Sequence, residues 1–139
     1  MYILRTEGHF DSAHFLANYD GKCSNIHGHR WIVDVEVQSD SLNKDGQLEG
    51  MVVDFGDLKK DVNDMLDEYD HSFIYQVGSL KESTIKSFNE EGFSIISIDF
   101  RPTAENFSKL FYDKLKDKGY NVRKVTVYET PKNYASYME

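Results

Sequence analysis

Residues 30–38, Arg-Trp-Ile-Val-Asp-Val-Glu-Val-Gln, decide the fold. Apolar and polar side chains alternate along this stretch, and the odd-numbered residues from Trp31 to Val37 are all apolar. Alternation of this kind, rich in β-branched residues, is typical of a strand with one buried face. Residues 2–14 carry similar short alternating runs, so we expect two strands joined by the turn-rich segment 15–26.

Two helices are expected from apolar residues spaced three and four apart. Asp54 has the side chain of an N-cap, and the residues that follow it predict a helix over about 56–69. Thr103 begins a second helix in the same way, and this helix closes at Gly119.

Two more strands are predicted, at 93–100 and 122–129. Residues 72–92 are polar with little periodicity, and we expect a loop with some helical turns there. The element order is therefore ββααββ, or close to it. This order indicates an α+β fold with a single domain over residues 1–139.

Composition narrows the classes of function. The formal net charge is −8, from 24 acidic and 16 basic side chains, which argues against a general nucleic-acid binder because phosphate affinity needs clustered Lys and Arg. No stretch has the apolar length of a signal peptide core or a membrane span. The single cysteine, Cys23, cannot form an internal disulfide, so we expect a cytoplasmic protein.

Three histidines indicate a metal site. His27 and His29 are two residues apart, so both imidazoles project from one face of a strand, and an antiparallel return brings His14 to the same place. Three neutral imidazoles suit zinc. His9 is an alternative third ligand, but it has the opposite strand parity to His14. Each histidine alone reads as an ordinary core or surface residue, whereas their grouping in one predicted hairpin favours the metal site.

Cys23 allows two interpretations. As a fourth ligand it would close a tetrahedral structural site, and as a free thiol beside the ion it would leave the fourth position open for a substrate. Spacing alone does not choose between them.

Two acidic positions complete the candidates. Asp70 and His71 directly follow the first helix, where they either form a carboxylate–imidazole pair that serves a nearby thiol or simply end the helix. Glu129 shares the parity of Val125 and Val127, so its carboxylate is directed inward at a strand end, where the two N–H groups of a planar ligand would satisfy it. A solvated carboxylate at a fraying strand end is the simpler alternative.

Six segments, in this order, resemble the 6-pyruvoyl-tetrahydropterin synthase family and span nearly the whole chain. They are 10–14 (Phe-Asp-Ser-Ala-His), 23–29 (Cys-Ser-Asn-Ile-His-Gly-His), 53–59 (Val-Asp-Phe-Gly-Asp-Leu-Lys), 70–71 (Asp-His), 102–106 (Pro-Thr-Ala-Glu-Asn) and 128–131 (Tyr-Glu-Thr-Pro). The gap of three residues between Cys23 and His27 is similar to the bacterial branch, the 6-carboxy-5,6,7,8-tetrahydropterin synthases of the queuosine pathway.

The resemblance implies the tunnelling fold (T-fold), with a four-stranded antiparallel sheet and two helices on one face. It also implies a homohexamer with active sites at subunit interfaces, so that Cys23 and His71 of one site can come from different chains. The implied enzyme is a zinc-dependent carbon–oxygen lyase. Its substrate would be 7,8-dihydroneopterin triphosphate and its products 6-carboxy-5,6,7,8-tetrahydropterin, acetaldehyde and triphosphate.

The resemblance gives each candidate residue a role. The zinc ligands are His14, His27 and His29. The catalytic residues are Cys23 as the thiolate base and Asp70 with His71 as a proton relay. The remaining contacts are Glu129 on the amino-pyrimidine edge of the pterin, Thr103 beside its ring, and Lys22, Arg30 or Lys132 as candidates for the triphosphate.

The chain departs from the family after Asp70-His71, where Ile74 and Tyr75 stand in place of a common Leu-Asn pair, so the family's local packing and substrate fit do not carry over to this position. Two alternatives stay open. One is the pyruvoyl-forming synthase, which product analysis distinguishes. The other is a non-catalytic module with a structural Cys-His zinc site, in which a Cys23→Ala change would lower metal affinity and stability together.

Overall fold

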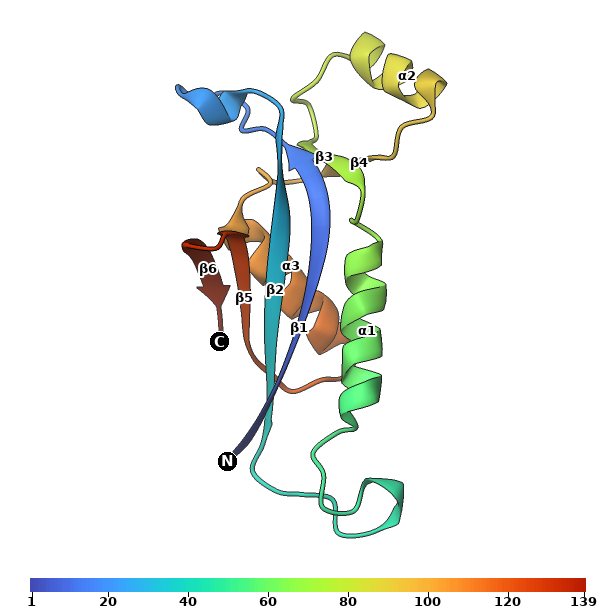
Figure 1. Cartoon of the computed structure of the whole chain (residues 1–139), viewed down its shortest axis with the longest axis vertical. Helices are drawn as coiled ribbons and strands as arrows, with labels where there is room; N and C mark the ends of the chain where they lie inside the picture. The colour runs from blue at the N-terminus through green and yellow to red at the C-terminus, as the bar shows by residue number, and fades with distance from the viewer.

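A computed structural model describes residues 1–139, and one long antiparallel strand pair forms its centre (Figure 1). β1 (Tyr2–His14) and β2 (His27–Ser39) pair over their whole lengths, with Tyr2 opposite Ser39 and His14 opposite His27. Both predicted strands are confirmed, and the second begins three residues earlier than expected. Their alternation sets one face of the pair against the helices and leaves the other face open.

Four further strands flank this pair: β3 (Ser72–Gln76), β4 (Ile95–Ile98), β5 (Val122–Thr130) and β6 (Asn133–Tyr137). The strand order across the sheet is β4-β3-β1-β2-β5-β6. β3 runs parallel to β1 and β4 parallel to β3, whereas β5 and β6 are antiparallel to their neighbours. The predicted α+β class holds, but the expectation of four antiparallel strands was wrong, because the sheet is mixed and has six strands.

The two unpredicted strands have physical reasons for being missed. The first four residues of β3 are all buried, so this strand shows no alternation of polar and apolar side chains. Residues of β6 are exposed or half-buried at the edge of the sheet, and their sequence carries little apolar signal.

Two helices cover one face of the sheet. α1 (Phe55–Asp67) begins at Asp54, whose Oδ1 accepts a hydrogen bond from Gly56 N at 2.6 Å. α3 (Ala104–Asp117) begins at Thr103, whose Oγ1 accepts one from Asn106 N at 3.3 Å. Both predicted helices and both predicted caps are therefore confirmed. None of the helices is long and apolar enough to cross a membrane.

A third helix, α2 (Glu82–Glu91), lies between β3 and β4, in the segment expected to be a loop with helical turns. It stands apart from the other two helices in Figure 1. Its Phe88 ring packs edge-on against Phe73 at 5.6 Å, and no residue of the helix is fully buried. The element order is thus β1-β2-α1-β3-α2-β4-α3-β5-β6 rather than ββααββ.

The core is an aromatic layer between the strand pair and α3. Phe10 of β1 stacks on Trp31 of β2 with ring centroids 5.9 Å apart, and Phe107 of α3 meets Trp31 edge-on at 5.0 Å. All three rings are fully buried, and each contributes roughly 1.5–3 kcal/mol of hydrophobic stabilisation. The Trp31 Nε1–H donates to Ser12 Oγ at 2.9 Å. This bond fixes the Trp31 ring beneath His14 and His29, the next residues on the same face of the two strands.

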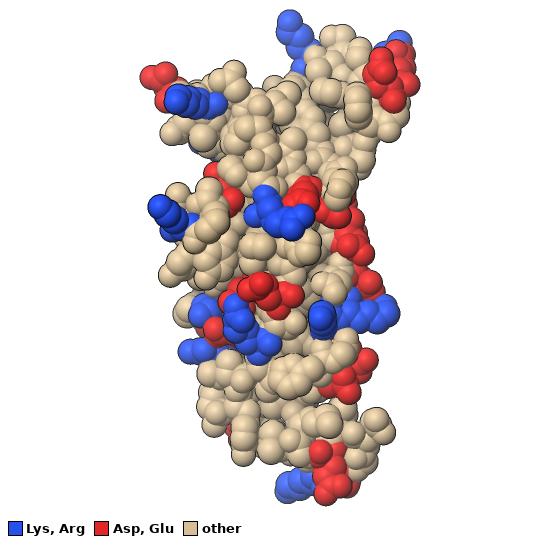
Figure 2. All heavy atoms as spheres, in the orientation of Figure 1, with Lys and Arg blue, Asp and Glu red and all other residues tan.

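The open face of the sheet carries ion pairs across its strands. Arg5 donates to Asp34 at 2.7 Å, and Glu36 accepts from Arg123 at 2.6 Å. Arg30 makes a bidentate ion pair with Asp11, donating to both carboxylate oxygens at 2.9 Å. Figure 2 accordingly shows basic and acidic side chains close together on this side of the molecule.

Candidate metal centre

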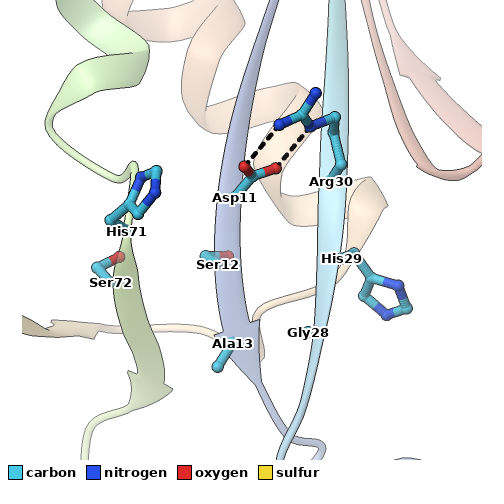
Figure 3. Close-up of a pocket in the computed structure, with 8 residues that line it drawn as sticks. All are labelled: Asp11, Ser12, Ala13, Gly28, His29, Arg30, His71 and Ser72. Carbon is cyan, nitrogen blue, oxygen red and sulfur yellow. Dashed lines mark hydrogen bonds and ion pairs between the residues drawn. The ribbon is translucent and has the colours of Figure 1, made fainter.

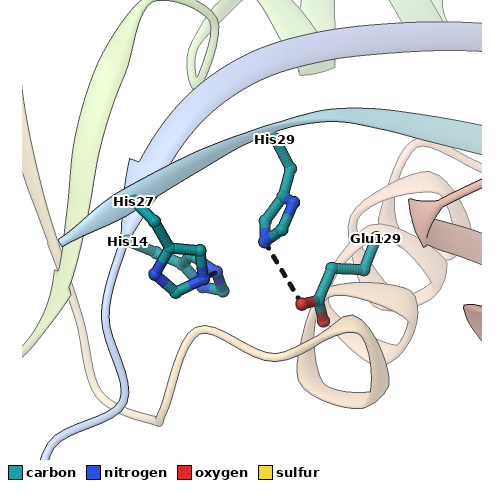
Figure 4. Close-up of side chains that lie close together, drawn as sticks. All are labelled: His14, His27, His29 and Glu129. Atoms are coloured by element: carbon teal, nitrogen blue, oxygen red, sulfur yellow. Dashed lines mark hydrogen bonds and ion pairs between the residues drawn. The ribbon is translucent and has the colours of Figure 1, made fainter. Parts of the chain in front are cut away.

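The three predicted histidines meet at one end of the β1–β2 pair. His14 lies opposite His27, and His29 follows two residues later on the same face of β2. Their ring centroids are separated by 4.5 Å (His14 to His27), 5.1 Å (His14 to His29) and 4.9 Å (His27 to His29). Figure 4 shows all three rings turned toward one space beside α3. Strand parity also places His9 on the opposite face, outside the cluster.

Hydrogen bonds to carbonyl groups orient two of these rings. The Nδ1–H of His14 donates to Pro102 O at 2.7 Å, and the Nδ1–H of His27 donates to Asn25 O at 2.7 Å. In the neutral rings the two Nε2 atoms then carry lone pairs, and these atoms face each other at 3.0 Å. Two acceptors this close repel each other unless a proton or a metal ion lies between them.

Glu129 supplies the fourth potential ligand atom of the cluster, a carboxylate oxygen. Its Oε1 lies 3.2 Å from His29 Nε2, and the four potential ligand atoms lie within 4.8 Å of one another. His29 Nε2 is buried and makes no hydrogen bond of acceptable geometry, even to this carboxylate. Three imidazole nitrogens and a carboxylate oxygen are a ligand set that suits zinc and other borderline divalent ions.

Burial favours the neutral form of His14 and His29, and metal ligation requires that form. It lowers the pKa of His14 to about 4, because this side chain is almost fully buried and an imidazolium would lose its hydration. Burial also lowers the pKa of His29, against the opposing effect of the Glu129 carboxylate. Neutral imidazoles can bind an ion near pH 7 without first releasing a proton.

The aromatic core holds the cluster from below. Trp31 lies edge-on to His14 at 5.0 Å and to His29 at 5.3 Å. Phe10, Phe107 and the hydrogen bond to Ser12 fix the position of the Trp31 ring, and the histidine rings pack against it.

A groove of about 600 Å³ opens beside His29 and Glu129, between the ends of β2 and β5. Its lining includes Gly28, Tyr128 and Thr130. A planar ligand of moderate size could lie there with one edge against the Glu129 carboxylate.

Cys23 lies outside the four-residue cluster. It sits in the 3-10 turn Lys22–Ser24 on the loop that joins β1 to β2, and it is half-buried and unpaired. Its carbonyl accepts a hydrogen bond from Leu16 N at 2.8 Å, which ties the two arms of the loop together. Within one chain, Glu129 rather than Cys23 is placed to be the fourth ligand.

Asp70 and His71 form a pair on the other side of β1, next to β3. Asp70 Oδ2 accepts from His71 Nδ1 at 2.8 Å, and Asp70 Oδ1 accepts from Asp11 N at 2.8 Å. The Asp11 amide is the main reason that the pKa of Asp70 lies below its ordinary value. His71 has a φ of 54°, rare for a residue with a side chain, and its own N–H donates to Asp11 O at 2.7 Å.

Figure 3 shows that the His71 and His29 rings extend from opposite sides of the β1–β2 pair. No hydrogen bond or ion pair joins Asp70 or His71 to the metal cluster. Within a single chain, the predicted proton relay and the predicted metal ligands therefore make no direct polar contact, although His71 and His29 line the same shallow pocket.

The other candidates have structural partners of their own. The Thr103 hydroxyl caps α3, and Arg30 forks Asp11 on the open face rather than standing free for an anion. Lys22 and Lys132 are exposed, and neither forms an ion pair. Of the three residues predicted to contact the triphosphate, only these two lysines have no ion-pair partner within the chain.

Three features of the site were not predicted from the sequence. The inward parity of Glu129 was predicted, but its position beside the histidines was not. The Pro102 carbonyl that orients His14 comes from a segment 88 residues away, and such backbone partners leave no signal in a sequence. The fork between Asp11 and Arg30 could have been found from their pairing across the predicted hairpin.

Comparisons with known proteins place the chain in a family. Residues 3–139 match the family described as 6-pyruvoyl tetrahydropterin synthase. The chain is 37% identical to the 6-carboxy-5,6,7,8-tetrahydropterin synthase of Haemophilus influenzae, with 100% of both chains covered. It is 35% identical to the protein of the same name from Aquifex aeolicus, over 85% of this chain and 76% of that one.

Solved structures show the same fold. The 6-pyruvoyl tetrahydropterin synthase of Caenorhabditis elegans is similar with a TM-score of 0.67 and 27% identity, over 100% of this chain and 97% of that chain. An uncharacterized protein from Wolinella succinogenes has a TM-score of 0.77 and 22% identity, over 99% and 98% of the two chains, which bears on the fold alone. The predicted tunnelling fold is confirmed. The chain belongs to the 6-pyruvoyl tetrahydropterin synthase family.

Proposed function

We propose that this chain is a zinc-dependent carbon–oxygen lyase that converts 7,8-dihydroneopterin triphosphate to 6-carboxy-5,6,7,8-tetrahydropterin, acetaldehyde and triphosphate in queuosine biosynthesis. The observation that carries the proposal is the pair of imidazoles of His14 and His27, whose Nε2 atoms lie 3.0 Å apart beside a third histidine and a groove. The full-length likeness to proteins named 6-carboxy-5,6,7,8-tetrahydropterin synthase supports the choice of product.

The residues of the cluster fit a catalytic zinc. His14, His27 and His29 would hold the ion, which supplies Lewis acidity toward the oxygens of the substrate side chain. Cys23 lies outside the cluster, which favours the free-thiol interpretation over the structural site. As a thiolate it would remove the carbon-bound proton next to those oxygens.

The pterin ring would lie in the groove beside His29. There Glu129 would accept two N–H groups from the amino-pyrimidine edge, and the exposed Lys22 and Lys132 would offer positive charge to the triphosphate. Thr103, which caps α3 next to the Pro102 carbonyl, would help to seat the ring.

Asp70 and His71 would act in a neighbouring copy of the chain. They lie across β1 from the cluster, and His71 is 80% exposed, so its ring is available to a partner surface. We infer a cytoplasmic homohexamer in which each site combines the metal and Cys23 of one chain with the proton relay of another.

The direct test is product analysis. Zinc-loaded protein incubated with dihydroneopterin triphosphate should release acetaldehyde and a carboxypterin in equal amounts, measured by mass spectrometry and a coupled aldehyde assay. A matched His27→Ala sample should release neither. A pyruvoyl product would favour the other branch of the family, and absence of turnover at full metal occupancy would leave a structural zinc module.

A further inference from the structure

We propose that Glu129 is the fourth metal ligand while no substrate is bound, and that it leaves the ion for the pterin edge when the ring enters the groove. One carboxylate would then serve the ion and the substrate in turn. The inference rests on the proposed function, because it takes the groove beside His29 as the pterin site.

The spacing of the ligand atoms fits a closed four-ligand shell. A tetrahedral zinc with bonds of about 2.0–2.1 Å places its ligand atoms about 3.4 Å from one another. The His14 and His27 Nε2 atoms are 3.0 Å apart, and Glu129 Oε1 is 3.2 Å from His29 Nε2. Both separations are close to the edge of such a tetrahedron, and all four atoms lie within 4.8 Å.

The contact between His29 Nε2 and Glu129 Oε1 also supports Glu129 as a metal ligand. His29 Nε2 is buried without a hydrogen bond although Glu129 Oε1 is 3.2 Å away, so the two atoms are near each other without being donor and acceptor. A cation between them would satisfy both. Three neutral imidazoles carry no charge, so a divalent ion in this half-buried place gains most from the one carboxylate in the cluster.

The Glu129 side chain is also free to leave. Its only close polar partner is His29, and about a third of it is exposed. It stands near the end of β5, where the pairing with β6 changes register between Tyr128 and Thr130, and it lines the groove directly. The carboxylate of Asp70, held by two hydrogen bonds, has no such freedom.

The consequence is an ordered opening of the metal site. A bidentate grip on the amino-pyrimidine edge uses both carboxylate oxygens, so the grip and the metal bond compete for the same carboxylate. Seating of the ring would therefore draw Glu129 away from the ion, which His14, His27 and His29 would still hold.

Metal binding without substrate tests the first half. Zinc affinity, measured by competition with a chelator, should fall about 10- to 100-fold in Glu129→Gln. Glu7→Gln is the matched control, since Glu7 lines the same groove outside the cluster, and it should bind zinc as the parent does. A Glu129→Gln protein with the zinc affinity of the parent would overturn the inference.

Cobalt spectroscopy tests the exchange itself. Isocytosine offers the amino-pyrimidine edge of a pterin without the second ring or the side chain. Added to the cobalt-substituted parent, it should change the visible d–d bands by removing Glu129, and it should leave the bands of Glu129→Gln unchanged. Unchanged bands in the parent at saturating isocytosine would contradict the exchange. Neither readout needs turnover, so failure of the proposed reaction and failure of the ligand exchange are separate results.

Discussion

The histidine cluster and the Asp70–His71 pair differ in how their charges are completed. In the cluster, imidazole nitrogens face one another and a carboxylate with few hydrogen-bond donors between them, so the arrangement favours a cation from outside. Around Asp70 every charge already has a partner, because Asp70 accepts from Asp11 N and His71, and Arg30 forks the Asp11 carboxylate. We therefore propose the first region as the ion site and the second as a group that holds and passes a proton without one.

The two regions also differ in their backbones. The proposed metal ligands His14, His27 and His29 lie in regular strands whose position is fixed by the aromatic core. His71 instead has a left-handed backbone, which costs on the order of 1–3 kcal/mol and persists because its N–H is bound to Asp11 O. Packing places the cluster, whereas local hydrogen bonds place the pair.

Removal of one metal ligand should give the largest effect. We expect His27→Ala to weaken zinc binding by more than about 100-fold and to abolish turnover, since the ion loses a direct bond. Metal content after dialysis, measured by mass spectrometry, checks this. The control is His9→Ala on the opposite face of β1, and a comparable zinc loss there would show that the cluster has been misassigned.

Removal of the thiol should separate chemistry from metal binding. Cys23→Ala is expected to lower turnover by about 10²- to 10⁴-fold, the usual contribution of a general base. Zinc content should stay at the parental level, because Cys23 lies outside the cluster. Loss of zinc together with activity would instead make Cys23 a ligand.

Neutralising the carboxylate of the pair should lower turnover by about 100-fold in Asp70→Asn, with zinc retained.

The contribution of Asp70 to folding stability should depend on pH. The pKa of Asp70 is lowered on folding, so its ionised form stabilises the protein above about pH 4, and this contribution disappears as the pH falls further. Because the Asp70 side chain is partly exposed, Asp70→Asn should lower the free energy of unfolding near pH 6 by about 1 kcal/mol or less.

Melting temperatures of the parent and of Asp70→Asn, recorded between pH 3 and pH 6, measure this contribution. The difference between them should shrink as the pH decreases. A difference that grows toward pH 3 would contradict the assigned direction of the Asp70 pKa shift.

The smallest effect is expected at the outer ion pairs. Arg30→Gln should change turnover a few-fold, because it leaves the Asp11 carboxylate unpaired next to Asp70 and His71. Arg5→Gln breaks a similar pair with Asp34 at a distance from the site and should leave turnover unchanged. Equal kinetics in the two variants would remove any role for the Asp11–Arg30 pair.

Sequence predicted the parts of this molecule that follow a regular period or a local rule. The alternation around Trp31, the cap at Asp54 and the parity of the histidines all have this character, and the structure has them as expected. The strands β3 and β6 have no such period, and α2 packs through few residues. The approach of Glu129 to His29 depends on the pairing of β5 with β2, which no single segment encodes.

Mixed assemblies give the most direct test of the claim that the cluster of one chain works with the Asp70–His71 pair of another. His27→Ala and His71→Ala chains, each inactive alone, can be co-expressed with different tags and purified through both tags in turn. Random mixing would give about one intact site in four, so roughly a quarter of the parental activity should return. Doubly tagged assemblies that stay as inactive as either parent variant would show that each chain completes its site alone.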